Sequence, residues 1–217
     1  MASDGMKPLL LVGAGSGSRE VLLLVHRMNA HRPQWRVLGF VDDDAALVGT
    51  NVDGYPVFAA DHPHNQDGIH AACGILDPAT RERLLASHVE ARGYSLATLI
   101  APDVVLPPDF SAAPGTVIMP SVTVSFEVQL GKGVFVLWGA TLGHHLRVGQ
   151  FGTILSGALI AGGCDVGHHS IIGAGAVVNV GVSIGSNALV GVGTTILASV
   201  PDGSRVVSMP RLVTLPG

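Results

Sequence analysis

The sequence contains few aromatic residues, few cysteines and few charged residues. Of its 217 residues, 5% are Phe, Trp or Tyr and 13% are Asp, Glu, Lys or Arg. The formal net charge of −4 gives no electrostatic attraction to nucleic acid, so we expect no nucleic-acid partner. The two cysteines, Cys73 and Cys164, make no disulfide framework, and we expect no signal peptide before them. We therefore expect a reduced, cytoplasmic setting.

Long hydrophobic runs are missing as well. No apolar run reaches the roughly 18 residues of a spanning helix, so we expect no membrane insertion. The hydrophobic content is nevertheless 47%, which is ample for a buried core in one or two domains. Glycine is abundant, with 29 residues, and together with the scarcity of aromatic residues it is typical of narrow coils that enclose little volume.

The dominant pattern is a six-residue repeat in the second half of the chain. Every sixth residue is Ile, Val or Leu over fourteen successive positions: Ile118, Val124, Leu130, Val136, Leu142, Val148, Ile154, Ile160, Val166, Ile172, Val178, Ile184, Val190 and Ile196. A glycine follows every third of them, eighteen residues apart. Neither a 3.6-residue helical period nor the simple alternation of a half-buried strand explains this spacing. The pattern predicts a parallel β-helix of three short strands per coil, beginning near Thr98, with the aliphatic residues inside.

A compact βαβ unit precedes the repeat. We expect strands at Pro8–Val12 and Trp35–Val41, a glycine-rich turn at Gly13–Ser18 and a helix at Arg19–His31, with an acidic end at Asp42–Asp44. Further along, Ile69–Leu76 is a strand candidate and Pro78–Arg92 is a helix candidate. These features predict two domains, a Rossmann-like one at 1–95 and a β-helix at 96–217 whose segment Pro201–Gly217 caps the open end.

The glycine-rich turn would place backbone N–H groups at a helix N-terminus, which favours phosphate. The acidic pair after the second strand suits a ribose or a base edge. The candidate nucleotide-binding residues are Gly13, Ala14, Gly15, Ser16, Asp42 and Asp43. A structural turn without a ligand remains open, because a glycine-rich turn after a strand is common and this one departs from the full dinucleotide fingerprint.

Two histidine pairs interrupt the repeat, at His144-His145 and His168-His169. His144 lies two residues beyond the inward Leu142, at a corner of the coil, so its ring should point outward. Histidine suits proton abstraction near neutral pH. The second pair is expected to consist of exposed corner residues.

At this point the chain resembles the hexapeptide-repeat sugar acetyltransferases of the sialic-acid and bacillosamine type, which include nucleotide-sugar N-acetyltransferases. The segments LLLVGAGSGSRE and LGFVDDD resemble the N-terminal pattern of that family, and GATLGHHLRVGQFGTILSGALIAGGCDVG resembles its catalytic coil. The segments SIIGAGAVVNVGVSIGSNALVGVGTTI and VPDGSRVVSMPRLV resemble its later coils and the close of the domain. The resemblance covers nearly the whole chain.

The resemblance implies a left-handed β-helix, an exception to the usual crossover rule. It implies a homotrimer with active sites between adjacent prisms, with acetyl-CoA in the groove and a nucleotide-linked amino sugar as acceptor for surface glycan synthesis. The catalytic pair would be His144 and His145, with His144 as general base and the N–H of Gly162 facing the oxyanion. No metal and no covalent enzyme intermediate are implied.

The same resemblance assigns coenzyme contacts. Ala174 and Val192 fall where the family touches the coenzyme with backbone atoms, and Thr153 falls where many members carry a coenzyme-contacting histidine. The chain departs from the family beside the base, where Gly143 and His145 stand in place of acidic residues. A backbone carbonyl or a remote acid would then have to orient His144.

Three other functions remain open at this stage. O-acetylation of a sugar hydroxyl needs the same base as N-acetylation. A metalloenzyme of the γ-carbonic anhydrase kind uses the same prism but needs three histidine ligands at one inter-subunit site. A non-catalytic scaffold would keep the prism without the chemistry.

Overall fold

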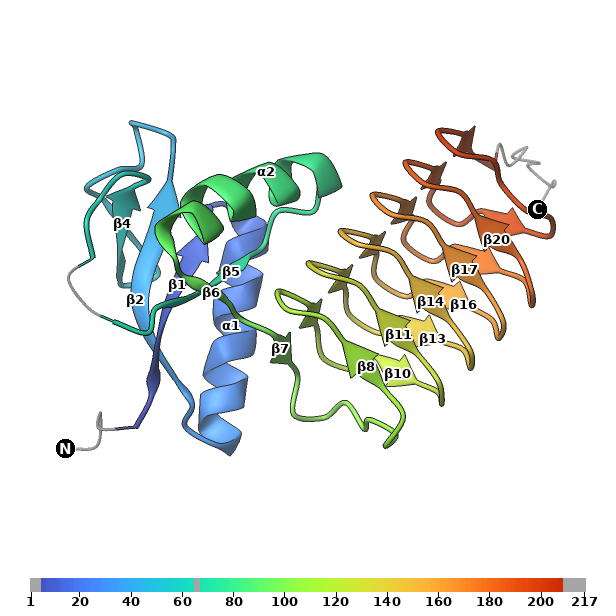
Figure 1. Ribbon diagram of the computed structural model, residues 1–217, viewed down its shortest axis with the longest axis horizontal. Helices are drawn as coiled ribbons and strands as arrows, with labels where there is room; N and C mark the ends of the chain where they lie inside the picture. Colours follow the sequence, from blue (N-terminus) through green and yellow to red (C-terminus); the bar gives the residue numbers. More distant parts are fainter. Residues whose placement is uncertain (1–4, 65–66, 209–217) are drawn as a thin grey trace, which may run out of the picture.

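The computed structural model describes residues 5–64 and 67–208 (Figure 1). It consists of an α/β unit and a stack of coils, which Figure 1 shows side by side. The α/β unit has one six-stranded sheet in the order β3-β4-β2-β1-β5-β6. Its strands are β1 (Lys7–Val12), β2 (Trp35–Asp42), β3 (Asn51–Val52), β4 (Tyr55–Ala59), β5 (His70–Cys73) and β6 (Ser95–Leu96). All neighbouring pairs are parallel except β3 with β4.

Two helices pack on this sheet, α1 (Ser16–His31) and α2 (Pro78–His88), and a 3₁₀ helix, η1 (Glu90–Arg92), follows. The alternation of β1 explains the arrangement, because successive side chains of a strand point to opposite faces. Leu9 and Leu11 are buried in one cluster with Val21 of α1. Leu10 is buried in the other cluster with Leu85 of α2.

The predicted elements of this unit are present, with some shifted ends. The first helix begins at Ser16, three residues earlier than expected, so the glycine turn is shorter. The third expected strand ends at Cys73 rather than Leu76. There the chain passes close to the first turn of α1, where a Cβ on Gly74 would overlap the backbone of Gly17. This close approach requires glycine at both positions and takes the chain out of the sheet.

The predicted parallel β-helix is confirmed. Its strands are two residues long and form three sheets, which are the faces of a triangular prism. Face 1 contains β7 (Leu99–Ile100), β9 (Val117–Ile118), β12 (Phe135–Val136), β15 (Thr153–Ile154), β18 (Ile171–Ile172), β21 (Leu189–Val190) and β23 (Arg205–Val206). Face 2 contains β10 (Thr123–Val124), β13 (Thr141–Leu142), β16 (Leu159–Ile160), β19 (Val177–Val178) and β22 (Thr195–Ile196). Face 3 contains β8 (Ser111–Ala112), β11 (Gln129–Leu130), β14 (Arg147–Val148), β17 (Asp165–Val166) and β20 (Ser183–Ile184).

The register between coils is the expected eighteen residues, as in the pairing of Leu142 with Ile160. The repeated aliphatic residue is the second residue of each strand and points inward. All of these residues are buried except Val124, which is half-buried. At the closing end, Val200 is buried and β23 adds the last strand. Residues 209–217 of the predicted cap lie outside the described residues.

The α/β unit packs on face 1 of the prism. The first residues of strands on this face point outward, yet Val117, Phe135 and Thr153 are 1%, 2% and 0% exposed. The joint contains a buried cation, Arg81 of α2, which is 1% exposed. In the part of the chain that the structure describes, no helix is long and apolar enough to cross a membrane.

Candidate active site

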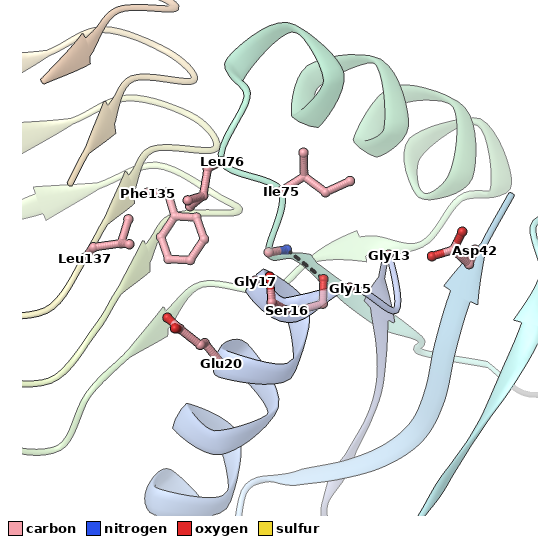
Figure 2. A pocket seen from close by; sticks show the side chains of 12 residues that line it. Gly13, Gly15, Ser16, Gly17, Glu20, Asp42, Ile75, Leu76, Phe135 and Leu137 are labelled. Carbon is pink, nitrogen blue, oxygen red and sulfur yellow. Dashed lines mark hydrogen bonds between the residues drawn. The ribbon is translucent and has the colours of Figure 1, made fainter. Parts of the chain in front are cut away.

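A pocket of about 430 Å³ lies between the glycine turn and face 1. Figure 2 shows Phe135 and Leu137 on its coil side, with Gly15 and Ser16 at the start of α1 opposite them. Helix α1 has no side-chain cap at its N-terminus. Among the described residues, the N–H groups of Gly15 and Ser16 have no hydrogen-bond partner. Unpaired N–H groups at the positive end of a helix dipole favour an anion such as phosphate.

The other predicted nucleotide-binding residues have structural partners. The N–H of Gly13 donates to the carbonyl of Val41 at 2.7 Å. The N–H of Ala14 donates to Oδ2 of Asp42 at 2.7 Å, so this carboxylate holds the turn while also lining the pocket. Oδ1 of Asp43 lies 2.9 Å from Nε2 of His88. Asp43 and His88 line a second, smaller pocket of about 210 Å³, which also borders Gly13.

His144 lies on the edge of the prism where face 2 turns into face 3. We call this edge the histidine edge, and its stacked corner residues, eighteen apart, are Phe126, His144, Gly162 and Val180. The His144 side chain is exposed, as the repeat predicts. Its ring stacks on Phe126, with 5.2 Å between centroids and 9° between planes. On its other side the ring lies against Gly162, where a Cβ would overlap Nε2 and Cε1 of the imidazole.

The structure therefore brings together His144 and Gly162, the residues to which the resemblance assigns the base and the oxyanion contact. Among the described residues the N–H of Gly162 has no hydrogen-bond partner. His145 is also adjacent, with 2.8 Å between the Nδ1 atoms of the two rings. An imidazole beside a free backbone N–H can take a proton from a nucleophile while the N–H binds a developing oxyanion.

The three residues with expected coenzyme contacts lie elsewhere. Ala174 is half-buried and Val192 is 73% exposed, and both are on the edge between faces 1 and 2. We call this the tryptophan edge, after its corner residues Trp138, Ser156, Ala174 and Val192. Thr153 is fully buried in the joint, and its hydroxyl donates to the carbonyl of Leu76 at 2.8 Å. This burial argues against a coenzyme contact by the Thr153 side chain.

The sequence interpretation missed several residues that the structure adds. Phe135 lines the glycine-turn pocket, and Phe126 and Glu127 lie beside the histidine pair. The repeat carried the signal for the last two, because they precede His144 and His145 by eighteen residues and therefore stack on them.

The two halves of the candidate site lie on different sides of one chain. The glycine-turn pocket is at face 1, whereas the histidine edge joins the other two faces. A nucleotide held at Gly15 therefore cannot present its sugar to His144 of the same chain without crossing the prism.

Comparisons with known proteins agree with this architecture. No protein-family model matches the sequence, and comparison with curated proteins yields no match. The acetyltransferase domain of PglB from Neisseria gonorrhoeae FA1090, in complex with acetyl coenzyme A, is 26% identical with a TM-score of 0.82, covering 94% of this chain and 97% of that one. This chain shares the fold of sugar N-acetyltransferases.

Two further structures have the same fold. PerB from Caulobacter crescentus, in complex with CoA and GDP-perosamine, is 24% identical with a TM-score of 0.82, covering 95% of this chain and 96% of that one. A histidine-to-asparagine mutant of perosamine N-acetyltransferase from the same organism is 23% identical with a TM-score of 0.83, covering 98% of this chain and 99% of that one. These matches confirm at the level of the fold the resemblance that the sequence predicts.

Proposed function

We propose that this protein is an acetyl-CoA-dependent N-acetyltransferase that acts on a nucleotide-linked amino sugar in surface glycan synthesis. The observation that carries the proposal is the position of His144 at a corner of the β-helix, where its Nε2 lies beside Gly162. The 26% identity to an acetyltransferase domain bound to acetyl coenzyme A, over 94% of the chain, supports the choice of acyl donor.

In this mechanism the amine nitrogen of the sugar attacks the thioester carbonyl carbon while Nε2 of His144 accepts a proton from the amine. The N–H of Gly162 binds the oxygen that becomes negative in the tetrahedral intermediate. When the carbon–sulfur bond breaks, His144 returns the proton to the coenzyme A thiolate. The products are the amide and the free thiol, and the histidine is restored.

The N-terminal domain, 1–95, would be a Rossmann-like unit that binds the nucleotide sugar, and 96–217 would be the left-handed acyltransferase domain. The unpaired N–H groups of Gly15 and Ser16 would hold the phosphates, with Asp42, which lines the same pocket, toward the ribose or base. Asp43 is left out of this set because its carboxylate lies against His88 at the other pocket. Ala174 and Val192 would contact the coenzyme through their backbone. Thr153 is left out of this set because its hydroxyl is already paired.

We further propose a homotrimer in which the histidine edge of one subunit faces the tryptophan edge and glycine-turn pocket of the next. This arrangement follows from the opposite placement of the two half-sites on one chain. The outward residues of face 2 are suited to such a contact, since Leu159 and Val177 are 41% and 38% exposed apolar residues. A threefold contact between unlike surfaces closes into a ring.

Thiol release from acetyl-CoA tests the activity. We expect turnover that requires an amino sugar, and His144→Ala should lower kcat by about 10²- to 10⁴-fold, the usual contribution of a general base. His168→Ala is the matched control, because His168 is also exposed and begins a histidine pair, and it should retain activity. Full turnover by His144→Ala would refute the assigned base. A hydroxyl analogue of the best amine separates N- from O-acetylation.

Mixing two inactive variants tests the shared site. Gly15→Glu should block the phosphate without disturbing the fold, since no atom lies within 4 Å of a Cβ at Gly15. In mixed trimers with His144→Ala, about one quarter of the sites combine an intact His144 with an intact pocket, so about one quarter of the activity should return. No recovery from trimers shown by native mass spectrometry to be mixed would indicate that the site lies within one chain.

A further inference from the structure

A carboxylate lies one coil below His145, at the same corner of the histidine edge. Glu127 and His145 are eighteen residues apart, and both have left-handed backbone, with φ of 55° and 54°. Because their backbones repeat, their side chains leave successive coils in the same direction. Oε2 of Glu127 lies 2.9 Å from Nε2 of His145. Glu127, His145 and His144 thus form a continuous row of polar side chains.

The contacts in this row favour one arrangement of protons. An ionised carboxylate oxygen 2.9 Å from a ring nitrogen repels a lone pair, so this contact favours the form of His145 with its proton on Nε2. In the neutral ring, Nδ1 of His145 is then an acceptor. Nδ1 of His144 lies 2.8 Å from it and must donate. The neutral His144 ring therefore presents a lone pair at Nε2, next to Gly162, where a proton acceptor is needed.

Packing holds the base ring in this orientation. Phe126 stacks parallel to His144 and meets His145 nearly edge-on, with 5.2 Å between centroids in both pairs. With the Gly162 backbone on its other side, the His144 ring cannot tilt without losing the stack. Rotation by half a turn about its last side-chain bond would remove Nδ1 from His145.

We propose that Glu127 is a positioning residue that selects the proton-accepting form of His144 through His145. It would supply the carboxylate that the residues flanking His144 lack, and in turnover its negative charge would stabilise the imidazolium formed on His144. The inference rests on the proposed function only in taking His144 as the base. The arrangement of protons is a property of the resting protein.

The second histidine pair provides an internal control. Oε2 of Glu82 lies 2.8 Å from Nε2 of His169, so the same carboxylate–imidazole contact exists there. The row stops at that point, however, because Nδ1 of His168 lies 2.9 Å from the Ser186 hydroxyl rather than meeting the neighbouring ring. Glu82→Gln therefore removes an equivalent charge far from the histidine edge.

Nitrogen-15 NMR of histidine-labelled protein without substrates tests the proton arrangement. Above about pH 8, where free histidine is neutral and prefers the proton on Nε2, we expect His144 in the Nδ1–H form. Glu127→Gln should shift His144 toward the other form or a mixture, whereas Glu82→Gln should leave it unchanged. His144 in the Nε2–H form in the wild-type protein, or no shift in Glu127→Gln, would overturn the proposal.

Kinetics provide the second measurement. Glu127→Gln should lower kcat by about 10- to 100-fold with little change in KM for acetyl-CoA. A loss of this size is typical when a residue that orients a functional histidine is removed. Glu127→Asp should recover part of this loss, and Glu82→Gln should match the wild type. If His144→Ala is inactive but Glu127→Gln is fully active, the positioning role fails alone. If the NMR shift occurs but His144→Ala keeps full turnover, the assigned base fails and the proton arrangement stands.

Discussion

Replacing Arg81 with alanine should weaken the joint between the α/β unit and the prism. The guanidinium donates to the backbone carbonyls of Ile75 and Leu76 in its own unit. It also donates across the joint to three carbonyls and a hydroxyl, those of Gly133, Phe151, Gly152 and Thr153, at 2.7–3.2 Å. None of these six partners is charged, so the guanidinium is a buried cation whose charge is distributed over dipoles.

The size of the effect follows from opposing contributions. Burial lowers the pKa of Arg81 to about 10, which corresponds to a cost of about 3 kcal/mol for desolvating the cation. Six hydrogen bonds from a charged donor offset this cost. Each buried acceptor left without a donor costs about 1–3 kcal/mol, although water entering the space relieves part of this. Removing one side of such a buried set typically costs about 3–5 kcal/mol, and we expect about 4 kcal/mol for Arg81→Ala.

Urea unfolding followed by tryptophan fluorescence measures this loss. Trp35 is buried in the α/β unit, whereas Trp138 lies at the joint, with Nε1 donating to Glu20 at 3.2 Å and Arg27 over its ring. Replacing Trp35 with phenylalanine leaves Trp138 as the only tryptophan. In Arg81→Ala on this background, the fluorescence of Trp138 should change at a lower urea concentration than the circular-dichroism signal of the coils.

The control is Arg83→Ala on the same helix, whose exposed side chain should change stability by less than about 0.5 kcal/mol. The loss of stability in Arg81→Lys should lie between those of Arg81→Ala and Arg83→Ala, because an ammonium group has only three N–H donors. A loss below about 1 kcal/mol in Arg81→Ala, with coincident transitions, would refute the reasoning.

Two further predictions concern the coil and the thiols. Gly162→Ala should preserve the fold but lower kcat at least about tenfold, because the new Cβ displaces the His144 ring. An unchanged kcat would contradict the close packing of Gly162 on that ring. Burial raises the pKa of the Cys73 thiol to about 11, and burial also raises the pKa of Cys164. Neither thiol should react with iodoacetamide in the folded protein near pH 8, whereas both should react in urea. Rapid labelling without denaturant would show that the buried sites open.

Much of the fold could be predicted because the repeat is a local rule. Aliphatic residues at six-residue spacing determine which side chains enter the prism, and the eighteen-residue period determines which residues stack. The exposed corner position of His144 and its closeness to Gly162 follow from this rule alone. The βαβ unit was also predictable from its glycine turn and flanking apolar runs, although its helix begins earlier than the pattern indicated.

The site was less predictable wherever it depends on contacts between distant elements. Thr153 occupies an outward strand position that is exposed on a bare prism, yet α2 and the chain after β5 bury it. The carboxylate of Asp42 was expected to bind a ribose or a base edge, yet it accepts a hydrogen bond from the N–H of Ala14. A remote acid or a backbone carbonyl was expected to orient His144, but the candidate Glu127 emerges only from the contact between side chains of two coils.

The sequence by itself determined the prism, its register and the columns of residues along each edge, because each coil repeats the same short-range geometry. Only the tertiary structure decided which face receives the α/β unit, since that depends on a buried arginine meeting carbonyl groups from separate coils. That choice sets the glycine-turn pocket on the side of the prism away from His144. The ring nitrogen of His144 that carries the proton is likewise decided by the tertiary structure, because it depends on how side chains from two coils meet.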